Sequence, residues 1–218
     1  SDDEYGPSQT QTQGKSSQLS GAEINSLADS LVHYIFVCDQ KKNPIKQIDM
    51  RKQVLKENGA AIKNVLEVAK EKLTQIFGVV LQPIVGRAGQ FMLINKIQDD
   101  LETPIITWSE DEQVKSCLLF IILSAIFMNE NVMSDEQLWT MLKKFGIEPD
   151  VAHEEFGDVK KLINNEYKQQ LYLDVVKNAT NEPPSYEYRW GPRAISEISK
   201  TNVLDFVCTV NILNLLFN

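Results

Sequence analysis

Apolar side chains recur every three or four residues along three stretches of the first half of the chain, which is the spacing of one helix face. The pattern predicts helices over 22–38, 48–57 and 60–77. Ser20 and Glu23 stand three residues apart just ahead of the first stretch, and this spacing is typical of a capping box. The first half is therefore expected to begin with three helices.

Two short β-prone runs follow the third helix, at 79–84 and 90–97. The segment 86–89, Gly-Arg-Ala-Gly, lies between them and predicts a hairpin turn. Gly78 is placed to end the preceding helix as a C-cap. Three helices followed by a hairpin is the order of a winged-helix module.

The same order of elements returns in the second half of the chain. Ser134 and Gln137 form a second capping-box pattern, Gly146 is expected to stop the helix that it opens, and Asp158 is a candidate N-cap. The expected helices are 111–128, 135–145 and 158–166, the strands are 171–176 and 186–190, and a last helix is 193–210.

The predicted fold is mainly α with short β-hairpin wings, arranged as two tandem winged-helix modules. The modules are expected at 20–97 and 110–218, joined by an acidic linker at 98–109. Residues 1–19 contain almost no apolar side chains and predict a disordered tail. The apolar residues 211–218 either extend the last helix or dock on a partner.

Composition agrees with an ordinary globular protein. The 218 residues carry 22 Lys and Arg against 30 Asp and Glu, a net charge of −8. The longest apolar stretch, 117–128, is shorter than the ~20 residues that span a bilayer, and the acidic N-terminus does not resemble a secretory signal. Three cysteines in apolar surroundings are expected to be reduced, buried thiols of an intracellular protein.

Basic residues concentrate in two places. Segment 41–72 holds nine Lys and Arg against four acids, and is either a solvated helix surface or a patch for nucleic acid or an acidic partner. In the second module, basic residues lie on the expected recognition helix and beside the wing, although acidic neighbours weaken the case for DNA. These possible DNA-binding residues are Lys160, Lys161, Arg189 and Arg193.

Candidate catalytic chemistry is scarce. The two histidines, His33 and His153, fall in different predicted modules, and no Cys–Cys or His–Cys pair has the spacing of zinc ligands. The sequence also lacks a glycine-rich phosphate loop and a nucleophile elbow. We therefore expect a protein that is not an enzyme and holds neither a metal nor a cofactor.

The first helix has more apolar surface than one core contact requires. Val32, Phe36 and Val37 lie outside its main stripe, so the helix is apolar nearly all round from residue 31 to 38. Two explanations are open: burial of this second stripe against the other module, or a groove for a partner.

Several segments together resemble the MAGE homology domain, over about residues 24–210. The most specific is YEYRWGPRA at 186–194. The others are LVHYIFV at 31–37, DQKKNPIK at 39–46, IFG at 76–78, MLIN at 92–95, IFM at 126–128, FGD at 156–158 and KKLI at 160–163.

This resemblance implies tandem winged-helix modules, no catalysis, and an adaptor that binds RING-type E3 ubiquitin ligases. Segment 39–46 is most similar to the ancestral branch, the non-SMC subunit that joins a RING protein and a kleisin in the five–six class SMC complex, which acts in DNA repair. In the family, adjacent leucines on helix one contact the RING partner, and they match Ile35 and Phe36 here. With Val32, these are the candidate partner-binding residues.

The family's second module holds a kleisin segment and, in the SMC-associated branch, contributes to double-stranded DNA binding. The resemblance places the protein in the nucleus, with the cytoplasm as a further location, and implies no membrane partner. Two alternatives stay open: a tandem winged-helix protein that binds double-stranded DNA, or a transcriptional cofactor that acts without a ligase.

Overall fold

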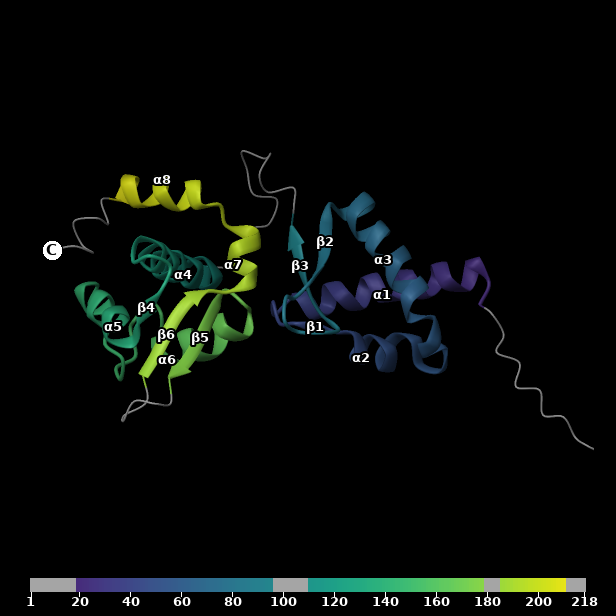
Figure 1. The fold of residues 1–218 in the computed structure, drawn as a ribbon, viewed down its shortest axis with the longest axis horizontal. Helices are drawn as coiled ribbons and strands as arrows, with labels where there is room; N and C mark the ends of the chain where they lie inside the picture. The colour runs from purple at the N-terminus through teal and green to yellow at the C-terminus, as the bar shows by residue number, and fades with distance from the viewer. Residues whose placement is uncertain (1–18, 96–109, 179–184, 211–218) are drawn as a thin grey trace, which may run out of the picture.

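The computed structural model describes residues 19–95, 110–178 and 185–210. Two units lie side by side, an N-terminal unit (19–95) and a C-terminal unit (110–210), and each has its own apolar core (Figure 1). The predicted linker and the final segment 211–218 lie outside the described residues, and so does the predicted tail apart from Leu19. The boundaries between modules therefore stay a prediction.

The N-terminal unit is built from helices and one small antiparallel sheet in the order β1-β3-β2. Its elements are α1 (Gly21–Asp39), β1 (Ile45–Lys46), α2 (Gln47–Met50), the π-helical η1 (Arg51–Leu55), the 3-10 helix η2 (Lys56–Ala61), α3 (Ile62–Phe77), β2 (Val79–Pro83) and β3 (Gln90–Asn95).

Local signals set the start of α1 and the end of α3 as predicted. The Ser20 hydroxyl accepts a hydrogen bond from the Glu23 amide, and the Glu23 carboxylate accepts one from the Ser20 amide at 2.7 Å. Gly78 ends α3 with φ of 64°, a left-handed conformation that glycine adopts without steric cost. The capping box and the C-cap are thus confirmed.

The second predicted helix, 48–57, is wrong in its form. Only α2 is α-helical, and the chain continues as η1 and η2. The break falls at Lys56, whose φ of 50° cannot continue a right-handed helix. The strand β1 was not foreseen, because its two residues are too short to show alternation; Ile45 pairs with Phe91 of β3.

The C-terminal unit repeats this arrangement with a sheet in the order β4-β6-β5. Its elements are α4 (Glu110–Met128), β4 (Met133–Ser134), α5 (Asp135–Lys144), α6 (Val159–Lys161), the π-helical η4 (Leu162–Tyr167), β5 (Leu173–Asn178), β6 (Ser185–Trp190), α7 (Pro192–Glu197) and α8 (Lys200–Val210). The described chain is mostly helical with two small antiparallel sheets.

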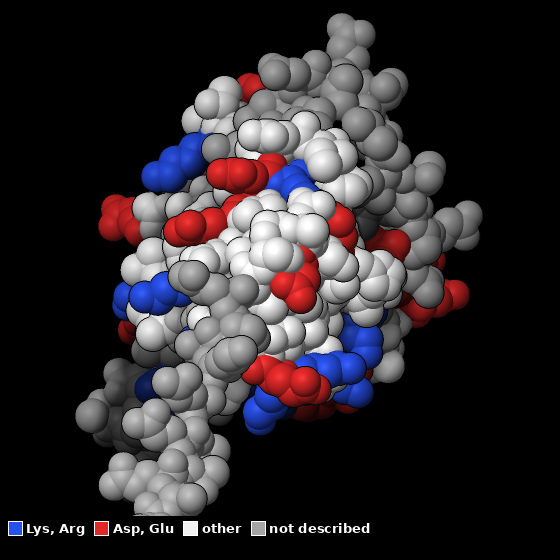
Figure 2. Space-filling view, turned by 90° about the vertical axis from the view of Figure 1, so that its right-hand side faces the viewer, with Lys and Arg blue, Asp and Glu red and all other residues white. Residues whose placement is uncertain are grey.

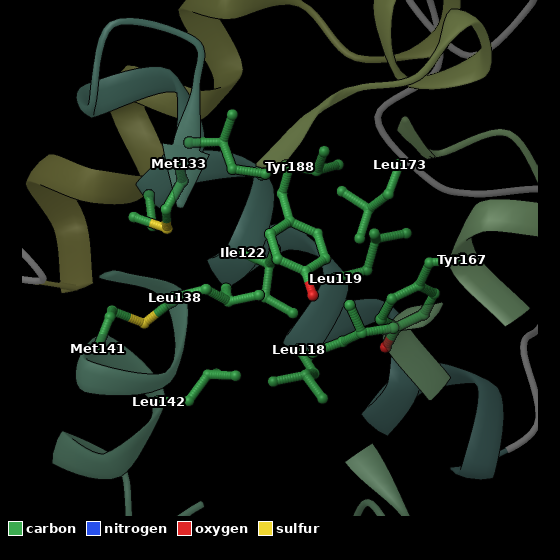
Figure 3. Packing of buried hydrophobic residues seen from close by; sticks show 14 of the residues in the cluster. Leu118, Leu119, Ile122, Met133, Leu138, Met141, Leu142, Tyr167, Leu173 and Tyr188 are labelled. Carbon is green, nitrogen blue, oxygen red and sulfur yellow. The ribbon is translucent and has the colours of Figure 1, made fainter. Parts of the chain in front are cut away.

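Helix α4 lies at the centre of the second core, as its apolar sequence predicts. In Figure 3, Leu118 and Ile122 of α4 face Leu142 of α5 and the ring of Tyr188 from β6. The caps at Ser134 and Asp158 are also confirmed, with the Asp158 carboxylate accepting from the Lys161 amide at 2.9 Å.

The single last helix expected over 193–210 is wrong, because the chain bends at Ile198, whose backbone is extended. Before the bend, α7 packs against β3 of the N-terminal unit, and after it α8 runs along α4 (Figure 1). Lys200 of α8 lies over the Phe127 ring of α4. The expectation of buried thiols is also wrong for Cys117 and Cys208, which are exposed. No helix in the described ranges combines the length and apolar character needed to cross a bilayer.

A tight corner joins β6 to α7. Trp190 ends β6 and donates its indole N–H to the Leu123 carbonyl at 2.8 Å, and Pro192 occupies the first turn of α7. Gly191 has an ordinary extended backbone, so a special turn conformation is not the reason for glycine. The reason is close approach: a Cβ on Gly191 would lie 2.2 Å from the carbonyl oxygen of Leu171.

Replacing Gly191 with alanine is therefore expected to destabilise the protein by about 3 kcal/mol or more, because backbone on both sides must shift to admit one methyl group. Gly21→Ala is the matched control, since nothing lies within 4 Å of its added Cβ. Urea unfolding followed by circular dichroism measures both. Equal stability of the two variants would contradict the close-approach explanation.

Candidate functional site

Two of the three predicted partner-binding residues on α1 are core residues. Val32 and Ile35 are both buried within the N-terminal unit, and Ile35 has no exposed surface. Helix α1 is covered by α3 on one side and by η1 and the sheet on others, so Val32 and Ile35 pack inside its own unit. This corrects the expectation that Val32 and Ile35 contact a partner directly.

The third residue, Phe36, is half-buried and leads to an exposed apolar surface. Its ring meets that of Phe77 edge to face, with centroids 5.0 Å apart. Around this pair, Val37 is 50% exposed, Phe77 46% and Ile76 67%. We call Phe36, Val37, Ile76 and Phe77 the α1–α3 ridge, because it joins the last turns of these two helices.

Sequence reasoning missed half of this ridge, since Ile76 and Phe77 continue the spacing of the core face of the third helix. The core contact of α3 ends at Leu73, which is fully buried. Gly78 stops the helix one residue after Phe77, so the last turn extends past the core. The sequence signal for their exposure is that two large apolar residues stand directly before a helix C-cap, beyond the last core contact.

Charge lies beside the ridge rather than on it. An ion pair joins Asp29 of α1 to Lys72 of α3, one helical turn before Ile76. This pair ties the two helices together across their seam. The arrangement is an apolar contact surface on a rigid base, suited to burial against a partner and to no covalent chemistry.

Three of the nine basic residues of segment 41–72 have local partners. Lys42 pairs with Asp39, Lys72 pairs with Asp29, and Lys70 lies over the Phe91 ring. Figure 2, which faces the end of the N-terminal unit, shows blue side chains at the lower edge and on the left side, with red ones near them, around a mostly white area. Both interpretations of the segment remain predictions.

Acidic neighbours hold two of the candidate DNA-binding residues in the C-terminal unit. Lys160 pairs with Asp150 at 3.1 Å and Arg189 with Glu187 at 3.0 Å, and both arginine and lysine are exposed. Lys161 is exposed on α6 next to Lys160. These residues are at the surface, but local pairing lowers the positive potential that they offer to a phosphate backbone.

Arg193 is not a surface residue, and the expectation that it contacts DNA is corrected. Its side chain has no exposed surface. The guanidinium donates to the carbonyl oxygens of Leu93 at 2.7 Å and Lys42 at 3.2 Å, both in the N-terminal unit. It lies between the two units because α7 packs against β3.

In the part of the chain that the structure describes, no three His, Cys, Asp or Glu residues gather to hold a metal ion. His33 is exposed on α1, and the ring of His153 stacks on Phe156 with centroids 4.8 Å apart.

Burial raises the pKa of Tyr34, Tyr167 and Tyr188, so these three phenols stay protonated at neutral pH. Burial first, then the hydrogen bond to Cys38 and the charge of Asp49, raise the pKa of Tyr34 to about 12. Burial is also the main cause that raises the pKa of Tyr167 and of Tyr188. These phenols serve as hydrogen-bond donors: Tyr167 donates to the Lys115 carbonyl at 2.7 Å.

Comparison with known proteins gives one family and several relatives. Residues 31–201 match the family model described as "MAGE homology domain". The chain is 38% identical to human "Melanoma-associated antigen D2" over 87% of its length, and 33% identical to mouse "Non-structural maintenance of chromosomes element 3 homolog" over 95%.

A solved structure described as the "Nse1-Nse3-Nse4 complex" contains a chain with a TM-score of 0.80 and 37% identity to this one, covering 88% of this chain and 92% of that chain. The lengths of the relatives differ widely. This chain spans 31% of the human antigen D2 protein and 13% of human "Trophinin", but 79% of the mouse element 3 homolog.

Proposed function

The chain belongs to the MAGE homology domain family, and from this we propose that it is a non-catalytic subunit that binds a RING-type E3 ubiquitin ligase subunit and a kleisin subunit in an SMC complex. The similar solved structure is described as an assembly of Nse1, Nse3 and Nse4. Two of the relatives, from mouse and human, are named "Non-structural maintenance of chromosomes element 3 homolog". A nuclear role in DNA repair belongs to the same proposal.

The observation that carries the proposal is the α1–α3 ridge. Isolated exposed apolar residues are common, but an aromatic pair flanked by two more exposed aliphatic residues on adjoining helix ends is typical of a contact surface. It lies on the helix where the family resemblance places the RING contact. The contact is therefore proposed at Phe36 and its neighbours on the ridge, in place of Val32 and Ile35.

We further propose that the two units are winged-helix modules. In each, a short strand follows the first helix, further helical segments come next, and two more strands complete an antiparallel sheet whose middle strand is the last of the three in sequence. This order supports the assignment. The kleisin contact is proposed on the C-terminal unit by family resemblance.

The test is binding of the RING-type subunit from the same source to the full chain, measured by calorimetry. Ile76→Asp is expected to weaken binding at least about 30-fold, because a charged group on a central contact residue costs about 2 kcal/mol or more. Ile76 is largely exposed, so the variant should keep its fold.

Val85→Asp is the matched control. Val85 is a 92% exposed apolar residue of the same unit, in the β2–β3 turn away from the ridge. Its variant should bind like the wild type. A wild-type chain that does not bind the RING-type subunit would contradict the proposed function. Two aspartate variants that bind equally well would contradict the proposed surface.

The alternative of a free-standing DNA-binding protein gains no support from the geometry. Of its four candidate residues, Arg193 is buried and Lys160 and Arg189 are paired with acids. Neutralised cations release fewer counterions on binding DNA, so they contribute less to affinity.

A further inference from the structure

A buried polar network lies between the two units, and it centres on Arg193. Besides the carbonyl oxygens of Leu93 and Lys42, the guanidinium donates to the Gln170 carbonyl at 2.9 Å and to the Glu197 carboxylate at 3.1 Å. Its acceptors thus come from both units. One planar, rigid side chain is the common donor that joins them.

Asp39, the last residue of α1, is the acidic neighbour from the N-terminal unit. Its Oδ1 atom is buried, has no hydrogen-bond partner, and lies 3.8 Å from an Arg193 nitrogen. The other oxygen of the same carboxylate accepts from Lys42. The network therefore reaches the end of α1, within one turn of Phe36 and Val37 on the ridge.

The surroundings hold the arginine in one place. The corner at Gly191 and Pro192 fixes its backbone, and the Arg193 amide donates to the Leu171 carbonyl at 3.0 Å. The Tyr172 ring lies beside the guanidinium, and its hydroxyl donates to Glu197 at 2.8 Å. Contacts within the C-terminal unit therefore hold the Arg193 side chain in the direction of the N-terminal unit.

Two further contacts join the units, an apolar cluster without directionality and one side-chain hydrogen bond. Leu171 forms a small apolar cluster with Ile84, Met92 and Ile94 of the N-terminal unit. Gln82 also donates to the Ser196 hydroxyl at 3.1 Å. Apolar contacts alone let one unit slide over the other, because they have no preferred direction. Hydrogen bonds from one guanidinium to the carbonyl groups of Leu93 and Lys42 hold the units in one relative orientation.

We propose that Arg193 is a positioning residue that sets the orientation of the N-terminal unit on the C-terminal unit and thereby couples their two partner sites. The coupling rests on the proposed function, in which the RING-type subunit binds the ridge and the kleisin binds the C-terminal unit. Two partners on one chain meet in a defined way only if the units keep one orientation.

Arg193→Lys tests the positioning directly, because lysine keeps the charge but a single ammonium group cannot serve the separated carbonyl acceptors. Arg189→Lys is the matched control, the same change at an exposed ion pair of the same unit. Spin labels at the exposed positions Lys63 and Thr140, one in each unit, report the distance between units by double electron–electron resonance on the full chain. The three native cysteines are replaced by alanine or serine in this background.

The wild type and Arg189→Lys are expected to show one narrow distance distribution, and Arg193→Lys a broad one or a second population. If Arg193→Lys fails to fold, Asp39→Asn decides, with Asp150→Asn at an exposed pair as its control. The positioning role is overturned if Arg193→Lys folds and shows the wild-type distance distribution. If Arg193→Lys does not fold, the role is overturned when Asp39→Asn shows the same distance distribution as Asp150→Asn.

The coupling is measured as the gain in affinity for the RING-type subunit when the kleisin subunit is present. A gain of about fivefold or more is expected for the wild type. It should disappear in the folded Arg193→Lys variant, while each partner alone still binds as before. A wild type without this gain, or a variant that keeps it, overturns the coupling. If the wild type does not bind the RING-type subunit, the proposed function fails, and the distance measurement still decides the positioning role.

Discussion

Replacing Ile35 with aspartate is expected to unfold the N-terminal unit, although family resemblance places this residue at a partner contact. Ile35 is fully buried among Leu31, Val65 and Ala69. Truncating a buried isoleucine to alanine costs about 2–5 kcal/mol, and an unpaired carboxylate in the same place adds its desolvation. Because whole domains are stable by only about 5–15 kcal/mol, most of the stability is lost.

Circular dichroism during thermal unfolding measures this effect, and His33→Asp is its control. His33 is exposed two residues earlier on the same helix, so its variant should unfold near the wild-type temperature. An Ile35→Asp variant that is as stable as His33→Asp would mean that α1 does not bury this face. The result matters for binding experiments, since loss of binding in Ile35→Asp would report unfolding rather than a lost contact.

Replacing Arg193 with methionine is expected to cost about 3–5 kcal/mol, the usual penalty for removing one member of a buried charge network. Methionine has a similar length but donates no hydrogen bond. The carbonyl oxygens of Leu93 and Gln170 would lose their donor, and Glu197 would lose its positive partner. Each unpaired buried acceptor contributes to the loss.

Arg189→Met provides the comparison at an exposed pair, where about 0–1 kcal/mol is expected. Urea unfolding of both variants gives the difference. The two units should also unfold in separate transitions in Arg193→Met if the network is what makes them cooperative. Equal stability of the two variants would show that methionine packing against Tyr172 replaces the network without loss.

The α1–α3 ridge could be predicted from the sequence only in part. The apolar excess of the first helix is visible as a pattern, and it indicates the helix that carries half of the α1–α3 ridge. It did not identify the exposed residues, because helical spacing assigns a residue to a face without saying what covers that face. Once α3 and the sheet cover α1, Val32 and Ile35 are inside, and Phe36 remains at the edge with Phe77.

The sequence by itself determined the features that depend on neighbours within a few residues. These are the capping boxes at Ser20 and Ser134, the C-cap at Gly78, the buried character of α4, and the hairpin strands. Hydrogen bonds within one turn and the apolar period decide them, so the local sequence carries the needed information.

Only the tertiary structure decided the features that depend on distant partners. The two-residue strands β1 and β4 exist because β3 and β6 pair with them. The bend at Ile198 separates α7, which packs against β3, from α8, which packs along α4. Arg193 reads as a surface cation in sequence, yet carbonyl groups from residues 42 and 93 hold it inside. Burial of a charge depends on acceptors more than a hundred residues away along the chain, and no local pattern records them.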